Sequence, residues 1–132
     1  MIVIDASALL EILLLTNRAD RLMQRALEGS ERLHAPHLLD IEVTQALRRL
    51  GQRAEISAVR AEQALEDFAQ LLIERHAHES LVPRIWQLRD SLTVYDGAYI
   101  ALAEALDAPL LTCDVKLARA HGHRASIEFI AN

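Results

Sequence analysis

Short β-branched and apolar runs in this chain alternate with longer segments in which apolar residues recur every three or four positions. The short runs predict strands at residues 2–4, 32–35, 75–78, 110–113 and 127–130. The longer segments predict helices at residues 8–15, 19–27, 37–50, 56–73, 81–92 and 115–120, and another that starts around Asp96. Strands that alternate with helices are typical of an α/β fold, in which helices cover both faces of a parallel sheet.

Apolar positions within these helices define the expected core. The helix at 37–50 should stop at Gly51, a common helix-ending residue. Its expected buried positions are Leu39, Val43, Ala46, Leu47 and Leu50. The expected buried positions of the helix at 56–73 are Val59, Ala61, Leu65, Phe68 and Leu72. In the helix at 81–92, Trp86 is expected in the core.

Two aspartates stand where predicted strands end. Asp5 follows the run Ile2–Ile4, and Asp114 follows the run at 110–113. Crossovers between parallel strands are nearly always right-handed, which puts these two strand ends on the same edge of the sheet. Open α/β sheets bind ligands at that edge. Asp5 also has an ordinary structural interpretation, because it or Ser7 could cap the helix that follows.

Two helical acids can reach the same edge if their helices start there. Asp96 lies in the first turn of its helix and shares a face with Tyr99 and Ile100, so it points along the buried side. A first-turn acid also interacts favourably with the helix dipole, and Thr93 is a candidate cap. Glu42 flanks the apolar stripe of its own helix, a position where acids are usually just solvated.

Together, the four acids suggest a chemistry that none of them suggests alone. The candidate catalytic residues are Asp5, Glu42, Asp96 and Asp114. Like charges at short range raise one another's pKa unless a cation neutralises them. Mg²⁺ and Mn²⁺ suit all-oxygen sites, where they can hold a phosphodiester, orient a water and lower its pKa. The hydroxyls of Ser7 and Thr112 are close to two of the acids in sequence and could orient them.

Length and composition limit the alternatives. The chain has 132 residues, of which 52% are hydrophobic, so a single domain over residues 1–132 is expected. Cys113 is the only cysteine, which excludes a disulfide within the chain and favours a reducing, cytoplasmic location. No segment reaches the ~18 apolar residues of a membrane span. Asp5 and Glu11 interrupt the apolar N-terminus, so it is not expected to be a signal peptide.

The formal net charge of −5 also bears on function. Non-specific nucleic-acid binding normally leaves a basic footprint, which this total does not show. The charge does fit a cluster of acids whose repulsion a bound cation relieves. The sign of the total does not decide between these possibilities, because the distribution of charge over the surface matters more.

The chain resembles the PIN-domain ribonucleases of the VapC toxin type over essentially its whole length. The resemblance rests on IVIDASALL at the N-terminus, IEVTQAL around Glu42, and YDGAYIALAEALDAPLLTCD, which contains Asp96 and Asp114. It implies a three-layer α/β/α sandwich with a central, mostly parallel sheet. It also implies Mg²⁺- or Mn²⁺-dependent endonucleolytic cleavage of RNA that leaves a 5′-phosphate and a 3′-hydroxyl. A cognate antitoxin that blocks the acidic site and a toxin homodimer are implied as partners.

The resemblance extends to single positions. The residues matched to the family's metal ligands are Asp5, Asp96 and Asp114. Glu42 matches an acid of the third helix and is interpreted as a ligand or an outer-shell acceptor. Thr112 matches a hydroxyl two residues before the last acid. Lys116 stands where some relatives carry a further acid, which leaves open whether a second metal ion is held.

Three other functions stay open. A phosphatase of the haloacid-dehalogenase type, with Asp5 as nucleophile, needs an acid at the position of Ser7. A receiver-like phosphoacceptor domain needs an aspartate at a strand end in the middle of the chain, where Asp67 lies inside a predicted helix. A PIN-like module that binds RNA or a partner without cutting is disfavoured by the four intact acids.

Two further features have no assigned role. Histidines at 76 and 78, and at 121 and 123, have spacings that zinc sites use, but they lack cysteine partners, which argues against zinc. The leucine-rich run at 9–15 is expected to be core or a dimer surface.

Overall fold

A central sheet of five parallel strands organises the protein. The computed structural model describes residues 1–132, and the strand order in the sheet is β3-β2-β1-β4-β5. The strands are β1 (Ile2–Ile4), β2 (Leu33–Pro36), β3 (Ile73–His76), β4 (Leu110–Thr112) and β5 (Ile127–Phe129). The chain builds outward from β1 to β3 and then returns to β4 on the other side. The switch point between β1 and β4 is where open α/β sheets place their ligands.

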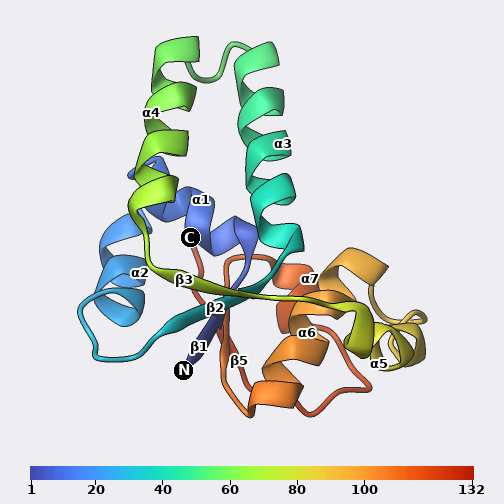
Figure 1. Ribbon diagram of the computed structural model, residues 1–132. Coiled ribbons are helices and arrows are strands. Elements are labelled where there is room, and N and C mark those ends of the chain that lie inside the picture. Colours follow the sequence, from blue (N-terminus) through green and yellow to red (C-terminus); the bar gives the residue numbers. More distant parts are fainter.

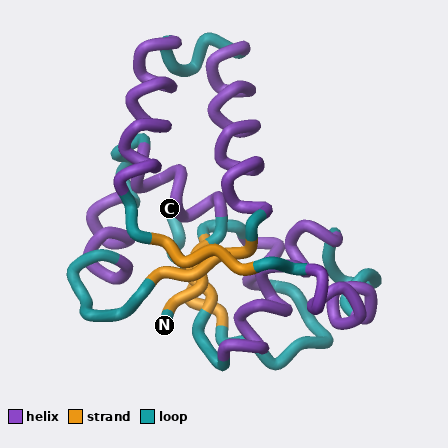
Figure 2. Tube along the Cα trace, in the orientation of Figure 1, coloured by secondary structure: helices purple, strands orange, loops and turns teal.

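Helices cover both faces of this sheet. They are α1 (Ala6–Leu13), α2 (Ala19–Ala26), α3 (Leu38–Gln52), α4 (Ala58–Gln70), α5 (Val82–Gln87), α6 (Val94–Leu106) and α7 (Val115–Ala118), with a 3₁₀ turn at Glu79–Leu81. Figure 1 shows α1, α2 and the base of the α3–α4 pair on one face, and α6 with α5 on the other. The strands form a thin twisted layer between them (Figure 2). The predicted α/β/α sandwich is confirmed, and its sheet is entirely parallel.

The core lies against β1 and α6. All three residues of β1 are fully buried because helices cover both of its faces. Helix α6 contacts β1, β2 and β4, and every residue from Gly97 to Glu104 is buried. Its N-cap is Thr93, whose Oγ1 accepts a 3.1 Å hydrogen bond from the backbone N–H of Asp96. No helix of the protein has the length and apolar character needed to cross a bilayer.

The α3–α4 pair extends away from the sheet as a long helical hairpin (Figure 1). The predicted buried stripe of its second helix is wrong at Val59, Leu65 and Leu72, which are all exposed. Only Phe68 and Ala64 of α4 are buried. Val59 lies in the first turn of α4, near the hairpin tip, where few parts of the protein are available to pack against it. Leu72 lies at the base of the hairpin, between α4 and β3, and is exposed there as well.

Element boundaries also differ from the sequence prediction. Helix α3 runs through Gly51 to Gln52, and the chain turns at Ala54, which has a φ of 55°. Helix α4 ends at Gln70, because Leu71 is extended with a ψ of 137°. The third strand consequently begins at Ile73, two residues earlier than predicted.

The predicted helix at 81–92 is shorter than expected, and its tryptophan is not in the core. Helix α5 ends at Gln87, and Ile85 and Leu88 fill the buried positions of this segment. The side chain of Trp86 is 60% exposed. The guanidinium of Arg89 instead lies over the indole ring, with its central carbon 4.4 Å from the ring centre.

Candidate active site

Asp5 is held at the end of β1 by three hydrogen bonds. As the N-cap of α1, it accepts a bond of 2.9 Å from the backbone N–H of Ala8. The same oxygen, Oδ1, accepts from the Ser7 hydroxyl at 2.7 Å. The other oxygen, Oδ2, accepts from the Thr112 hydroxyl at 2.5 Å. Asp5 is only 4% exposed, so the capping interpretation is correct and still leaves a buried carboxylate to explain.

Ser7 and Thr112 join the ends of β1 and β4. Their hydroxyl oxygens lie 3.2 Å apart. Ser7 Oγ accepts a 3.0 Å bond from the backbone N–H of Cys113, and Thr112 Oγ1 accepts a 2.9 Å bond from that of Asp114. The two hydroxyls therefore fix the Asp5 carboxylate relative to the backbone that carries Asp114.

Asp114 and Asp96 both lie at helix starts on this edge. Asp114 is the N-cap of α7 and accepts a 2.9 Å bond from the backbone N–H of Lys116. Asp96 is in the first turn of α6. Both residues are half-buried, so their side chains still meet solvent.

Glu42 approaches the same edge from α3. Its Oε1 accepts a 2.6 Å hydrogen bond from the phenolic hydroxyl of Tyr99, a buried residue of α6. Sequence reasoning placed Tyr99 on the buried face of its helix but gave no sign of this partner. The only available signal was that Tyr99 lies three positions after Asp96 on the same helix face.

Each of the four acids affects, or is affected by, the charge of another. Burial raises the pKa of Asp5 to about 6, although hydrogen bonds from Thr112, Ala8 and Ser7 oppose the rise, and the charge of Asp114 adds to it. Burial also raises the pKa of Asp96, again with a contribution from Asp114. Burial raises the pKa of Glu42, and the charge of Asp96 adds to the effect. The four carboxyls therefore lie close enough to repel one another.

The spacing of these acids matters for any bound ion. Only one group of three side chains has possible ligand atoms that all lie within 4.8 Å of one another. This group is His34, Glu74 and His76, on β2 and β3, and it includes none of the four acids. The four acids are more widely spaced than that. Mg²⁺ usually keeps several of its waters, so a site for it does not need a compact cage of protein ligands.

A cleft of about 460 Å³ leads away from Ser7 and Cys113 between α1 and α3. Its lining includes the side chains of Arg18, Arg49 and Arg53. Arg18 is paired with Glu11 at 2.9 Å, whereas Arg49 and Arg53 are exposed. A chain with a net negative charge thus has a cleft with two exposed arginines that reaches Ser7, the hydrogen-bond partner of Asp5, and composition could not indicate this.

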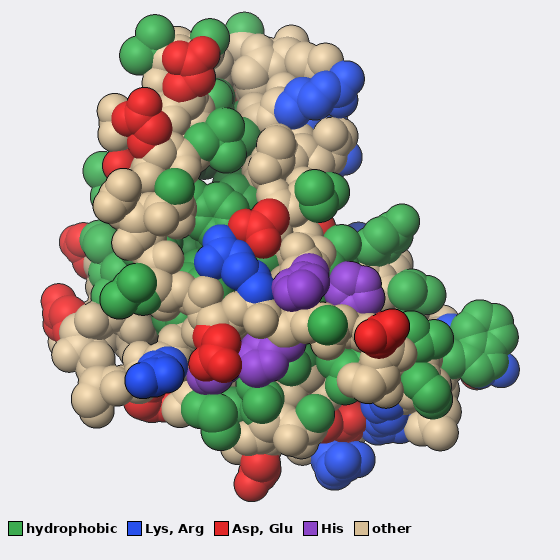
Figure 3. All heavy atoms as spheres, viewed as in Figure 1, with side chains coloured by type: hydrophobic (Ala, Val, Ile, Leu, Met, Phe, Trp, Pro, Cys, Tyr) green, Lys and Arg blue, Asp and Glu red, His purple; other side chains and the backbone are tan.

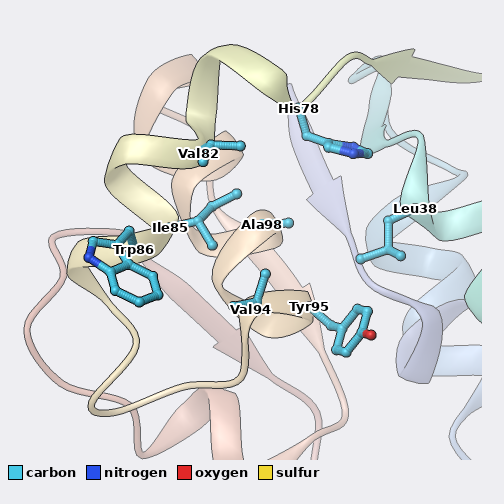
Figure 4. A pocket seen from close by; sticks show the side chains of 8 residues that line it. All are labelled: Leu38, His78, Val82, Ile85, Trp86, Val94, Tyr95 and Ala98. Carbon is cyan, nitrogen blue, oxygen red and sulfur yellow. The ribbon is translucent and has the colours of Figure 1, made fainter.

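An apolar pocket lies between α5 and the starts of α6 and α3. Figure 4 shows the side chains that line it: Leu38, His78, Val82, Ile85, Trp86, Val94, Tyr95 and Ala98. Several of these residues are more than half exposed, among them Trp86 and Tyr95. Its lining contains none of the four acids.

Comparison with known proteins identifies the family. A model of the PIN domain matches residues 2–122, a range that contains all four acids. Ribonuclease VapC12 of Mycobacterium tuberculosis is 45% identical over 131 residues, which cover 99% of this chain and all of that protein. The chain belongs to the PIN-domain family of VapC ribonucleases. Ribonuclease VapC9 of the same organism is 44% identical over 117 residues, covering 89% of this chain and 88% of that one.

Solved structures share the PIN-domain fold. PAE2754 from Pyrobaculum aerophilum superimposes with a TM-score of 0.69 at 22% identity, covering 96% of this chain and 81% of that one. VapBC2 from Rickettsia felis, solved bound to a DNA fragment from its promoter, gives a TM-score of 0.70 at 13% identity and covers 98% of both chains. At these identities the likeness shows the fold alone.

Proposed function

We propose that this protein is the toxin of a VapB–VapC pair and cleaves RNA phosphodiester bonds with water. The reaction takes place at the carboxyl ends of β1 and β4, where Asp5, Glu42, Asp96 and Asp114 lie; we call this region the acidic edge. The proposal rests on one observation above all. Four carboxyls from separate elements converge on that edge with coupled charges, in a chain that is 44–45% identical to named VapC ribonucleases. In this proposal Asp5, Glu42, Asp96 and Asp114 are the catalytic residues.

A divalent cation fits these residues. All the candidate ligand atoms are carboxylate oxygens, which is the donor set that Mg²⁺ and Mn²⁺ prefer. Burial and repulsion by the charge of Asp114 raise the pKa of both Asp5 and Asp96, and a cation offsets both effects. We assign Asp5, Asp96 and Asp114 as the residues that hold it. Such an ion would supply charge stabilisation at the phosphate and lower the pKa of a water.

The protein's own side chains prepare this site. Ser7 and Thr112 each donate to a different oxygen of Asp5, so the carboxylate is held in one orientation. Tyr99 holds one oxygen of Glu42, and the second oxygen remains for a water or a metal-bound ligand. Because the pKa of Glu42 is raised, its carboxylate is a better proton acceptor than an ordinary glutamate.

The arginine-lined cleft supports RNA as the substrate. Phosphate contacts by arginine position a nucleic-acid backbone without reading its sequence. Arg49 of α3 and Arg53, the residue that follows this helix, both line the cleft that reaches Ser7. A strand laid along this cleft would bring a phosphodiester to the acids.

Partners and location belong to the same proposal. We assign a cognate antitoxin that covers the acidic edge, and a second copy of this chain as a homodimer partner. The exposed apolar pocket of α5 and α6 supports the homodimer, because contiguous apolar surface of this kind usually marks an interface. A cytoplasmic location follows from the RNA substrate and the reducing environment that a lone Cys113 favours. The single domain over residues 1–132 stays a prediction.

The test is RNA cleavage by purified protein freed of any partner. A structured RNA pool is incubated with and without Mg²⁺ or Mn²⁺, using the unmodified protein, Asp96→Asn, and Asp90→Asn as a matched control at an exposed site. We expect metal-dependent cleavage that Asp96→Asn abolishes and Asp90→Asn retains. Equal cleavage by Asp96→Asn would refute the site. RNA binding without cleavage by the unmodified protein would favour a non-cutting PIN-like module instead.

A further inference from the structure

The neighbouring strands β2 and β3 carry two histidines and a glutamate on one face of the sheet. In the strand register, His34 is paired with Glu74, and His76 lies two positions further along β3. Ile73 and Arg75 point to the opposite face, where Arg75 binds Asp40 of α3 at 2.8 Å. Because side chains alternate along a strand, Glu74 and His76 share the face of α6 with His34.

The ligating atoms of this group are close together. His34 Nδ1 lies 2.8 Å from His76 Nε2 and 3.7 Å from Glu74 Oε2, and all three atoms fall within 4.8 Å of one another. The sequence had suggested His78 as the companion of His76, but strand pairing gives it His34. His78 lies instead beside His37, with the ring centres 6.4 Å apart. Figure 3 shows histidine side chains gathered on the face over β3.

His34 is an unusual choice for a buried strand position. Its side chain is 5% exposed, and its Nε2 has no hydrogen-bond partner. Whichever ring of the His34–His76 pair donates, one nitrogen of His34 stays buried and unpaired. An ion bound at His34 Nδ1 would not give this Nε2 a partner, so the support for a site here is the closeness of the three ligand atoms and not the unpaired nitrogen. Burial favours the neutral imidazole, which is the form that binds metals.

We propose that His34, Glu74 and His76 form a zinc site, separate from the acidic edge, that clamps β3 to β2. Two imidazoles and one carboxylate, with a water in the fourth position, are a set of ligands that Zn²⁺ commonly takes. With bonds of about 2.0–2.1 Å, tetrahedral ligand atoms lie about 3.3 Å apart. The two nitrogens would therefore separate slightly and Glu74 would move slightly inward. Both movements are open to them, because Glu74 and His76 lie on the edge strand and Glu74 is 54% exposed.

The clamp would act at the base of the α3–α4 hairpin. Strand β2 leads directly into α3, and α4 leads into β3, so the two strands are the stems of that hairpin. Joining them through a metal would fix the helix that carries Glu42. Because the Glu74 side chain is 54% exposed, an ion bound here could enter and leave the folded protein from that side.

Zinc titration of the untagged protein, followed by calorimetry and by melting temperature, tests this site. Millimolar Mg²⁺ is present throughout, because it occupies carboxylate sites but competes poorly for imidazole. The variants are His76→Asn and Glu74→Gln, both at accessible positions, with His78→Asn as the matched histidine control. We expect one Zn²⁺ to bind and to raise the melting temperature of the unmodified protein and of His78→Asn alike.

His76→Asn should lose at least about 100-fold in zinc affinity, because losing even an outer partner of a ligand costs 10–100-fold. Substituting Co²⁺ should give visible absorption bands that this variant lacks. Zinc binding that His76→Asn retains, or that Mg²⁺ displaces, would overturn the proposal. A circular dichroism melt of the metal-free variants checks that they fold. None of these readouts uses RNA, so failure of the ribonuclease assay would leave this result unaffected.

Discussion

Tyr99 of α6 and Glu42 of α3 are joined across the acidic edge by a 2.6 Å hydrogen bond from the phenol to the carboxylate. The two helices come from opposite faces of the sheet, so this bond ties both layers to the candidate site. Burial, the bond itself and the charge of Glu42 raise the pKa of Tyr99 far above its usual range. The phenol of Tyr99 therefore stays protonated near neutral pH and donates this hydrogen bond.

Replacing Tyr99 by phenylalanine should slow RNA cleavage more than it harms folding. Loss of the outer partner of a ligand typically costs about 10–100-fold in activity or metal affinity, and we expect a loss of that size. The free energy of unfolding should fall by about 1 kcal/mol, the typical worth of a single hydrogen bond. The measurements are initial cleavage rates and urea denaturation. Tyr95→Phe, at an exposed position, is the control and should change neither. Unaltered cleavage by Tyr99→Phe would remove Glu42 from the catalytic assignment.

The pKa of Asp5 predicts how the metal-free protein responds to pH. The folded state keeps the Asp5 proton up to about pH 6, whereas the unfolded chain releases it near the ordinary value of 3.8. The folded state thus binds more protons between these values, so its stability should decline as pH rises through them. The rise of about two pH units corresponds to about 3 kcal/mol.

This decline is measured by urea denaturation of the chelator-treated protein at a series of pH values. Asp5→Asn removes the titrating group, so its stability should vary less with pH and should exceed that of the parent near neutral pH. Added Mg²⁺ should reduce the decline in the parent, because a cation favours the ionised carboxylate. An equally steep decline in Asp5→Asn would assign the pH dependence to another group.

Much of the candidate site was predictable because local sequence placed it. Asp5 and Asp114 follow β1 and β4 directly, and each caps the helix that comes next. Asp96 lies one turn into a helix whose cap, Thr93, was also predictable. Termini of this kind depend on a few neighbouring residues. The meeting of the strand ends followed from the handedness of parallel crossovers.

Other parts of the structure depend on tertiary contacts that periodicity does not encode. The apolar spacing of α4 is helical, yet Val59 is 76% exposed because the hairpin leaves the sheet. Trp86 is exposed for a similar reason, since the short α5 buries Ile85 instead. The pairing of His34 with His76 depends on strand order, because β2 and β3 are adjacent although about 40 residues separate them.

A buried ion pair on the other face of α6 gives a further prediction. The Glu104 carboxylate accepts bonds from Arg84 at 2.7 and 3.0 Å and from the backbone N–H of Arg124 at 2.9 Å. The bond from Arg84 is the main cause that lowers the pKa of Glu104 to about 2. Glu104→Gln leaves the half-buried guanidinium of Arg84 without its charged partner, and we expect a loss of about 2 kcal/mol in unfolding free energy, the worth of a hydrogen bond to a charged group.

The contribution of the Arg84–Glu104 pair to the free energy of unfolding should decrease as pH falls, whereas that of Asp5 should decrease as pH rises. The pair stabilises the fold above the ordinary Glu pKa of 4.5, and this stability is lost as pH falls toward 2. The difference between the parent and Glu104→Gln should therefore shrink in acid. Thermal melts over this range test it, with Glu31→Gln, which breaks an exposed pair with Arg25, as the control. A difference that stays constant into acid would show that packing, and not charge, is lost.

The apolar pocket of α5 and α6 predicts the oligomeric state. Trp86, Val94 and Tyr95 line it and are each more than half exposed, so a second copy packed there would cover apolar surface that the monomer leaves in water. Tryptophan side chains at the centre of an interface commonly contribute about 2 kcal/mol or more. Trp86→Glu should therefore weaken dimerisation by at least about 30-fold.

Sedimentation equilibrium across a concentration series measures that change. Val59→Glu introduces the same charge at a position on α4 that is 76% exposed and lines no part of the pocket, so this control should dimerise like the parent. A dimer that persists in Trp86→Glu would place the interface elsewhere, with the leucine-rich α1 as the next surface to test. If the parent itself stays monomeric at every concentration, the pocket is not a self-association surface. If Trp86→Glu does abolish the dimer, its RNA cleavage shows whether a monomer suffices for activity, because none of the four acids lines the pocket.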